Sequence, residues 1–228
     1  VLGIVWSVLN PLLFMLCTTI VFSTMFRNQI ENFPIYFLSG QIMFSFFAES
    51  TGLAQTSLIE NGSLIKKVYT PKYIFPLSKV FFALVNLSFS LIAVFLIILI
   101  MGYSIPLTSM LFFLPIMYLF LFSLGIGLLL SSLTVFYRDI LHIYSVFLSL
   151  LSFFSATFYP ISIIPENVRG FIEYNPIYIF ISYFRMLILD GHLPDLKLNL
   201  LAVLYCLVST IIGYRIFKKN ENKIVLFI

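Results

Sequence analysis

The chain has 228 residues, of which 61% are hydrophobic, 18% are aromatic and only 10% are charged, with a formal net charge of +4. This apolar content exceeds what a soluble domain of this length can bury in one core, so the composition predicts a membrane protein. The basic residues lie in short segments between long apolar runs, which argues against a nucleic-acid partner and points to membrane topology as the origin of the charge.

Six apolar runs are long enough to cross a membrane, because about 20 helical residues span the hydrocarbon core. They are Ile4–Phe26, Phe33–Leu58, Leu77–Met101, Ser109–Phe136, Ile140–Phe158 and Leu198–Phe217. We therefore expect an all-α polytopic membrane protein with six transmembrane helices, forming a single transmembrane domain over residues 1–228. The sequence begins at Val1, without methionine and without a cleavable signal pattern, so we also expect a segment to be missing at the N-terminus.

A seventh apolar piece, Ile177–Leu189, is too short to cross and contains Arg185. Together with Asn167–Tyr174 it predicts a re-entrant pair of short helices between the fifth and sixth spans, set in a segment rich in helix breakers. These breakers are Pro160, Pro165, Gly170, Pro176, Gly191 and Pro194. We expect such a pair to cap an exit path.

The basic residues divide unequally between the two sides that six crossings define. One side carries Lys66, Lys67, Lys72, Lys79, Arg138, Arg215, Lys218, Lys219 and Lys223. The other side carries Arg27, Arg169, Arg185 and Lys197. Because cytoplasmic loops carry the excess of Lys and Arg, we expect both termini to be cytoplasmic.

The chain offers little chemistry of its own. It has no G-x-x-x-x-G-K-[ST] phosphate loop, so ATP binding would have to come from a partner. His142 and His192 are isolated, and Cys17 and Cys206 each lie within an apolar run. We therefore expect no catalytic residue, no metal site and no cofactor in this chain.

Glu49 is the one ionisable residue in the middle of an apolar run, and two interpretations remain open. A carboxylate inside a membrane can act as an ion relay. Many neighbouring residues are polar, however, which favours a side chain that is paired with another helix or faces water within the bundle.

One face of the fifth run is aromatic, since Tyr144, Phe147, Leu151, Phe154 and Phe158 recur at steps of three and four. Most such stripes are packing seams between helices. Stacked rings also offer a non-ionic surface along which a chain such as a glycan can slide, and both interpretations stay open.

The turn between the second and third runs, Glu60–Val80, holds four lysines within fourteen residues. Ser63–Tyr69 alternates apolar and basic residues and predicts a short interfacial helix, with a cap near Asn61 and an end imposed by Pro71. Membrane anchoring explains the lysines in part. A protruding, proline-delimited helix also suggests a docking element for a soluble protein.

Five stretches, taken in order, carry a resemblance to a known family. They are "LGIVWSVLNPLLFMLCTTIVFSTMF" (Leu2–Phe26), "FPIYFLSGQIMFSFFAES" (Phe33–Ser50), "NGSLIKKVYTPKYIFPLSKV" (Asn61–Val80), "LTVFYRDI" (Leu133–Ile140) and "FYPISIIP…YNPIYIFISYFR" (Phe158–Arg185). The chain resembles the membrane subunits of type-2 ABC transporters, and within them the branch that exports O-antigen, capsule or teichoic acid.

The resemblance implies a bacterial inner-membrane permease that contacts membrane lipids and exports a lipid-linked polysaccharide. It would work as a homodimer with two copies of an ATPase subunit, and that subunit would bind ATP and Mg. The resemblance further implies that a coupling helix contacts the ATPase through Asn61, Ser63, Leu64, Lys66, Lys67, Tyr69, Pro71 and Lys72. A second cytoplasmic corner would comprise Tyr137, Arg138 and Asp139, with a charge-assisted network between the last two.

The resemblance also implies a route for the substrate. The conduit would be lined by Trp6, Tyr144, Phe147, Phe154 and Phe158. The exit gate would contain Pro160, Pro165, Pro176, Tyr183 and Arg185. The family usually has an amphipathic helix before the first span, and its absence here agrees with a missing N-terminal segment.

Three alternatives compete with this interpretation. A type-2 permease for drugs or lipids would carry a large external domain or other loop signatures. An intramembrane glycosyl or acyl transferase would need His, Asp or Glu side chains converging at one membrane face, whereas the acids here are scattered. A secondary transporter would show inverted repeats, and none stands out.

Overall fold

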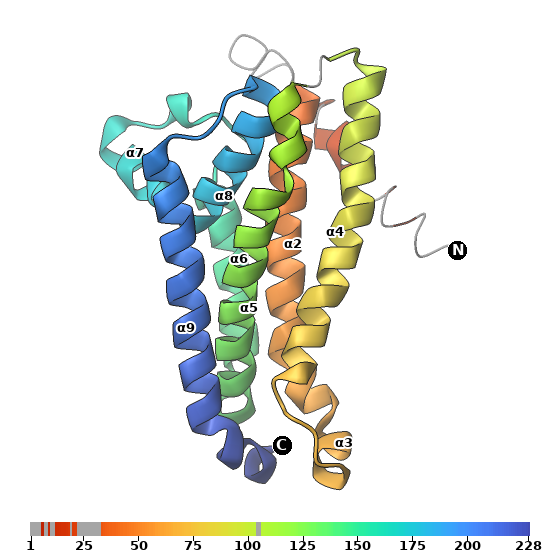
Figure 1. Cartoon of the computed structure of the whole chain (residues 1–228), viewed down its shortest axis with the longest axis vertical. Coiled ribbons are helices and arrows are strands. Elements are labelled where there is room, and N and C mark those ends of the chain that lie inside the picture. Colours follow the sequence, from red (N-terminus) through yellow and green to blue (C-terminus); the bar gives the residue numbers. More distant parts are fainter. Residues whose placement is uncertain (1–5, 7–8, 10–11, 19, 22–32, 104–105) are drawn as a thin grey trace.

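The computed structural model describes residues 6, 9, 12–18, 20–21, 33–103 and 106–228, and every regular element within them is helical. The bundle in Figure 1 contains α2 (Phe33–Glu60), α3 (Gly62–Lys67), α4 (Ile74–Ile100), η1 (Leu107–Leu111), α5 (Phe113–Phe136), α6 (Ile140–Phe154), η2 (Ile161–Ile163), α7 (Glu166–Glu173), α8 (Pro176–Arg185), η3 (Met186–Asp190) and α9 (Leu196–Phe227). The all-α prediction is confirmed for these residues.

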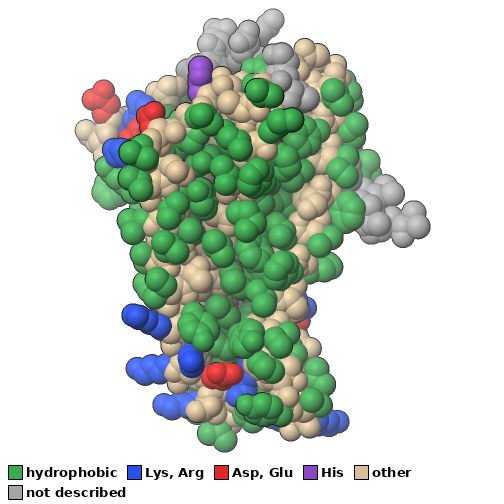
Figure 2. Space-filling view, in the orientation of Figure 1, with side chains coloured by type: hydrophobic (Ala, Val, Ile, Leu, Met, Phe, Trp, Pro, Cys, Tyr) green, Lys and Arg blue, Asp and Glu red, His purple; other side chains and the backbone are tan. Residues whose placement is uncertain are grey.

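The long helices are apolar on their outer surface as well as inside. Within the described residues, three helical segments are long and apolar enough to cross a membrane, namely Ile74–Ile100, Leu107–Phe136 and Leu196–Phe227. Hydrophobic side chains cover the middle of the bundle, while Lys and Arg gather at the end that holds α3 and the last turns of α9 (Figure 2). This distribution suits a helical bundle surrounded by lipid.

Two helix ends differ from the sequence prediction. The fifth apolar run was expected to reach Phe158, but α6 ends at Phe154, because Ala156 adopts a left-handed backbone with φ of 46° that breaks the helix. The last run was expected to end at Phe217, but α9 continues through the polar segment to Phe227. Part of the first predicted run, Ile4–Phe26, lies outside the described residues.

The core is centred on α2 and α8. Phe37 and Phe46 of α2 and Phe180 and Phe184 of α8 are fully buried, and Leu119 of α5 joins them. Because α8 is covered on all sides, it is a buried core helix, which explains why its sequence is almost continuously apolar.

The helices α5 and α9 approach unusually closely. A Cβ atom added at Gly125 would overlap the backbone of Ser209, and one added at Gly213 would overlap the Gly125 carbonyl group. Small residues let helix backbones come together, and Gly125 belongs to a Gly-x-Gly segment of α5. The two helices lie side by side along most of α5 (Figure 1).

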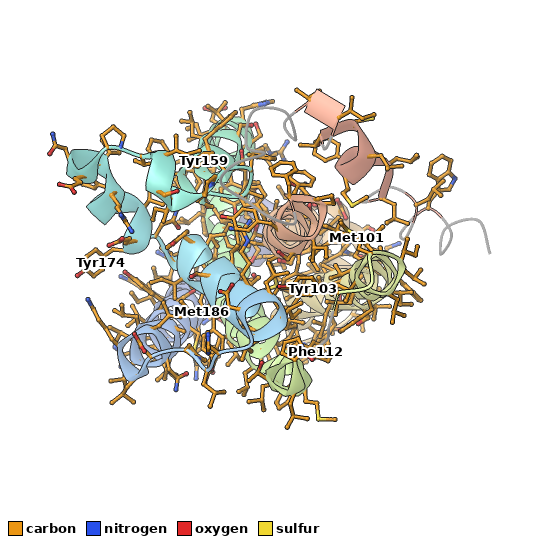
Figure 3. The ribbon with its side chains drawn as sticks, turned by 90° about the horizontal axis from the view of Figure 1, so that it is seen from above. Met101, Tyr103, Phe112, Tyr159, Tyr174 and Met186 are labelled. Atoms are coloured by element: carbon orange, nitrogen blue, oxygen red, sulfur yellow. The ribbon has the colours of Figure 1, made fainter. Side chains whose placement is uncertain are left out.

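At the end of the bundle opposite α3, η3 lies beside η1 and Tyr103 (Figure 3). The Tyr103 hydroxyl donates a hydrogen bond to the Leu189 carbonyl at 3.0 Å, and the Thr108 hydroxyl donates to the Leu187 carbonyl at 2.9 Å. These bonds satisfy carbonyl groups in the π-helical turn of η3, where regular helical pairing is altered.

Candidate functional site

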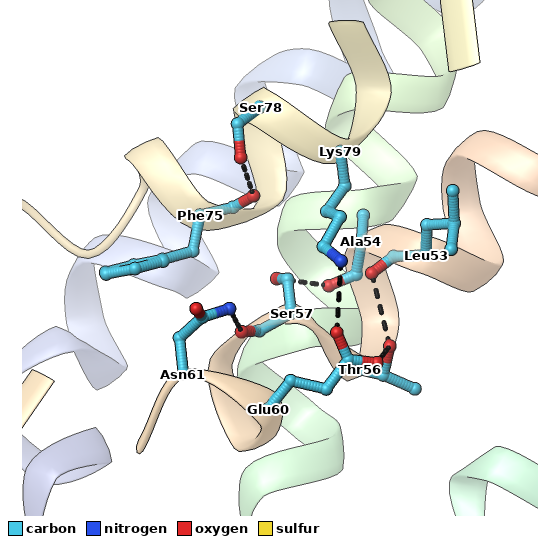
Figure 4. A network of polar contacts seen from close by, with 9 residues as sticks. All are labelled: Leu53, Ala54, Thr56, Ser57, Glu60, Asn61, Phe75, Ser78 and Lys79. Atoms are coloured by element: carbon cyan, nitrogen blue, oxygen red, sulfur yellow. Dashed lines mark hydrogen bonds and ion pairs between the residues drawn. The ribbon is translucent and has the colours of Figure 1, made fainter. Parts of the chain in front are cut away.

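The lysine-rich turn forms a structured corner, which we call the basic corner and define as residues 60–79. Figure 4 shows the network that holds its two flanking helices together. Glu60, at the end of α2, accepts a hydrogen bond from Thr56 at 2.6 Å. It also forms an ion pair with Lys79 of α4, with 3.1 Å between Lys79 Nζ and Glu60 Oε2. The hydrogen bond from Thr56, and after it that from Lys79, lowers the pKa of the Glu60 carboxyl.

The helix α3 in this corner is shorter than predicted. It ends at Lys67, because Val68 is extended and the chain then runs to Pro71 without resuming a helix. Asn61 occupies the N-cap position, but its side chain donates to the Ser57 carbonyl of α2 at 2.8 Å instead of accepting from α3. The predicted cap near Asn61 is confirmed in position, but it is the Asn61 backbone carbonyl that accepts from the N–H groups of Leu64 and Ile65.

The predicted coupling residues divide into two groups. Leu64, Lys67 and Tyr69 point away from the bundle and are exposed, Tyr69 completely so. Ser63 and Pro71 are also exposed. Lys66 and Lys72 instead reach α9, where Lys72 Nζ donates to the Glu221 carbonyl at 2.6 Å and Lys66 Nζ donates to the Ile228 carbonyl.

The second predicted corner, between α5 and α6, is exposed at all three positions. Tyr137 is extended and ends α5, and the Asp139 carbonyl accepts from the backbone N–H groups of His142 and Ile143 as α6 begins. The two ion pairs found among the described residues join Lys79 to Glu60 and Arg169 to Glu173. The network expected between Arg138 and Asp139 is therefore not formed there.

Part of the predicted conduit lines an apolar pocket of about 450 Å³. Tyr144, Phe147 and Phe154 of α6 line it together with Leu151, and residues of α2, α5, α7 and α8 complete its wall. The Tyr144 hydroxyl donates to Thr51 Oγ1 at 2.6 Å, so this polar group is already paired.

The other two predicted conduit residues lie elsewhere. The Phe158 ring stacks on Phe37 with centroids 5.7 Å apart and borders a separate cavity of about 270 Å³. Trp6 is exposed and lines neither space. The helical periodicity that grouped Phe158 with Tyr144 fails because α6 ends at Phe154.

Two predicted gate residues are buried structural groups. Arg185 is only 5% exposed, and its guanidinium donates to the carbonyls of Tyr36, Ala156 and Thr157 at 3.0–3.1 Å. Its central carbon also lies 3.5 Å from the centroid of the Tyr36 ring. Tyr183 is buried and its ring packs edge-on against Tyr118.

The predicted gate prolines begin helices. Pro160 and Pro165 directly precede η2 and α7, and Pro176 is the first residue of α8. Asn175 caps α8, since its side chain accepts a hydrogen bond from the Ile177 N–H at 2.9 Å. Proline is favoured at the first helical position, which Pro176 occupies, because its missing N–H would be unpaired there.

The intramembrane carboxylate has a partner that sequence analysis missed. Asn86 Nδ2 of α4 donates to Glu49 Oε1 of α2 at 2.6 Å. A signal existed, since Asn86 is the only amide side chain within the apolar run Leu77–Met101. The contact favours the interpretation of Glu49 as a group paired between helices.

Comparison with known proteins identifies a family. The model of the ABC-2 type transporter family matches residues 1–189. An O-antigen export system permease protein, RfbA, of Klebsiella pneumoniae is 30% identical over 227 residues, covering 98% of this chain and 86% of that protein. RfbA of Myxococcus xanthus is 30% identical over 198 residues, covering 85% and 75%.

A more distant relative is the polysialic acid transport protein KpsM of Escherichia coli, 22% identical over 229 residues, covering 97% of this chain and 87% of that protein. The family match extends over most of the chain, from the first apolar run to the end of the buried helix α8. The apolar helical bundle has the architecture that a membrane component requires. The chain therefore belongs to the ABC-2 type transporter family, as a transport permease and not an enzyme.

Proposed function

We propose that this chain is the membrane subunit of an ATP-driven exporter that moves a lipid-linked polysaccharide across the bacterial cytoplasmic membrane. The observation that carries this proposal is the similarity, over nearly the whole chain, to permeases whose names specify O-antigen export and polysialic acid transport. ATP and Mg bind to a separate ATPase subunit, and two permease copies assemble with two ATPase copies.

The proposed topology has six spans with both termini in the cytoplasm. It combines the first apolar run with α2, α4, α5, α6 and α9, and leaves α7 and α8 as a pair that enters from outside without crossing. The gathering of Lys and Arg at the end that holds α3 and the last turns of α9 supports this orientation (Figure 2).

The exposed face of α3 is the proposed docking site for the ATPase. Leu64 and Tyr69 present apolar surface, and Lys67 adds a positive charge beside them. Exposed aromatic and aliphatic side chains next to a charge are typical anchors of a protein interface.

The apolar pocket beside α6 is the proposed part of the conduit that this chain supplies. The outer face of α6 is exposed, with Ile143, Val146, Leu150 and Phe153 all more than half exposed. A second copy of the permease covering this face would complete a passage between the two subunits.

Capture of the ATPase on the purified permease tests the docking proposal. We expect Leu64→Glu and Lys67→Glu each to abolish co-purification of the ATPase, because they place a negative charge on the docking face. Arg169→Glu, on α7 at the opposite end, is the control and should leave capture unchanged. Equal capture by all three variants would contradict the proposed docking face.

Export itself is tested by deleting the gene for this chain. We expect surface polysaccharide to disappear and lipid-linked polysaccharide to accumulate inside the cell. Surface polysaccharide at the wild-type level would contradict the proposed substrate class.

A further inference from the structure

The last turns of α9 pack against the basic corner and not against the main core. Ile224 and Phe217 of α9 are buried in a separate apolar cluster with Ile65 of α3 and Leu58 of α2. Figure 1 places α3 and the end of α9 at the same end of the molecule. Burial of Ile65 in this cluster fixes which face of α3 remains outside.

Two lysines reinforce this packing. Lys72 donates a hydrogen bond to the Glu221 carbonyl, within the last two turns of α9, and Lys66 donates to the Ile228 carbonyl directly after the helix. Ammonium groups interact favourably with the last turn of a helix, where the helix dipole is negative, and the contact of Lys66 with Ile228 lies there. These side chains are therefore directed onto their own chain.

A close approach at Gly62 has the same effect. Gly62 is buried at the start of α3, and a Cβ atom added there would overlap Cγ2 of Ile228. The absence of a side chain at this position lets α3 lie directly on the end of α9.

The middle of α9 is connected in turn to α5. The Ser209 hydroxyl donates to the Phe122 carbonyl at 2.8 Å and the Thr210 hydroxyl donates to the Leu121 carbonyl at 3.0 Å, beside the close approach of Gly125 and Gly213. A displacement of α9 therefore cannot occur without α5, since the two backbones are in contact.

We propose that residues 217–228 form a seat for α3 within the same chain, and that Lys72 is a positioning residue that holds the basic corner on this seat. The seat transmits a displacement of α3 to α9 and α5. A second route runs through α2 and α4, which precede and follow α3 in the chain. This inference rests on the proposed function, in which the ATPase pushes on α3.

Disulfide cross-linking tests the seat without reference to transport. In a chain with Cys17 and Cys206 changed to Ser, the pair Gly62→Cys and Ile228→Cys should form an intramolecular disulfide in membranes under mild oxidation, detected by mass spectrometry. The pair Gly62→Cys and Arg169→Cys is the control and should remain reduced. Absence of the first disulfide, with both variants folded, would overturn the seat.

A comparison of three lysine variants in the permease–ATPase complex tests the role of Lys72. Lys72→Met should retain capture of the ATPase but lower export and permease-stimulated ATP hydrolysis by about tenfold, the order expected for one charge-assisted hydrogen bond. Lys72→Arg should restore both, because its side chain can still donate to Glu221. Lys219→Met, an exposed lysine on the same turns, should match wild type.

The two proposals fail in different ways. Loss of ATPase capture by Lys72→Met would place Lys72 on the docking face and overturn its role as a positioning residue. Normal coupling by Lys72→Met would also overturn it. Failure of the wild-type chain to capture any ATPase would contradict the proposed function, whereas the cross-link would still report on the seat.

Discussion

At the scale of single residues, the buried polar groups of this bundle hold helices together. Arg185 is the clearest example, since its guanidinium binds one carbonyl of α2 and two carbonyls of the segment that follows α6. Its place in a short apolar segment suggested a functional cation. Only the fold shows that backbone carbonyls, and not a substrate, surround it.

Replacing Arg185 with Met should destabilise the protein by about 3 kcal/mol, because three buried carbonyl groups would lose their donor. The midpoint of thermal unfolding in detergent, followed by size-exclusion chromatography with fluorescence detection, measures this loss. Arg169→Met is the control, since the exposed pair of Arg169 with Glu173 contributes at most about 0.5 kcal/mol. Similar midpoints for the two variants would refute the structural role of Arg185.

Glu49→Gln should retain polysaccharide export, since the glutamine amide oxygen can accept the hydrogen bond that Asn86 donates. Glu49→Leu should lower the amount of folded protein, because the Asn86 amide would lose this acceptor. Surface polysaccharide, normalised to the permease in the membrane, measures both effects. Loss of export in Glu49→Gln at normal permease levels would instead reveal an ion relay.

At the scale of helices, the length of the apolar runs located the long elements among the described residues, because each one needs an apolar surface in lipid whatever its neighbours are. Helix ends were harder to place. The left-handed Ala156 shortens α6, and the second apolar cluster at Ile224 supports α9 beyond its apolar run. Both depend on contacts between segments far apart in the sequence.

The direction of side chains around α3 could not be predicted for the same reason. The alternation of apolar and basic residues indicated an interfacial helix, but the rotation of that helix is set by the burial of Ile65 against α9. Lys66 and Lys67 are neighbours in sequence and both are exposed, yet the Lys66 side chain reaches back to Ile228.

The contact between α5 and α9 should be sensitive to a single methyl group. Gly125→Ala would place Cβ against the backbone of Ser209, which cannot rotate away, so we expect a loss of about 2 kcal/mol. Gly52→Ala is the matched control, since no atom lies within 4 Å of its added Cβ and alanine favours a helix. The unfolding midpoint in detergent should fall for the first variant alone, and a drop in neither would contradict the close packing.

At the scale of the whole molecule, charge distinguishes the two ends of the bundle. The end with α3 is rich in Lys, while the end with α7 carries acids and bases together (Figure 2). The excess of Lys and Arg at one end could be predicted from the sequence, since it depends only on which loops lie between apolar runs. The pocket beside α6 could not, because five separate helices form its wall.

The proposed orientation predicts the pattern of chemical labelling. With Cys17 changed to Ser, a membrane-impermeant maleimide should label Glu166→Cys on intact cells, whereas it should label Lys67→Cys only after permeabilisation. Both positions are exposed, so access to the reagent depends on the side of the membrane alone. Labelling of Lys67→Cys on intact cells would reverse the topology and remove the basis for ATPase docking.

The length of α9 bears on how far from the membrane the proposed ATPase would bind. Its 32 residues measure about 48 Å at 1.5 Å per residue, whereas the hydrocarbon layer is about 30 Å thick. A straight helix of this length that crosses upright extends about 18 Å beyond the hydrocarbon layer in total. In the proposed orientation, the last turns of α9 and the docking surface beside them therefore lie at the level of the headgroups or outside it, within reach of a soluble ATPase.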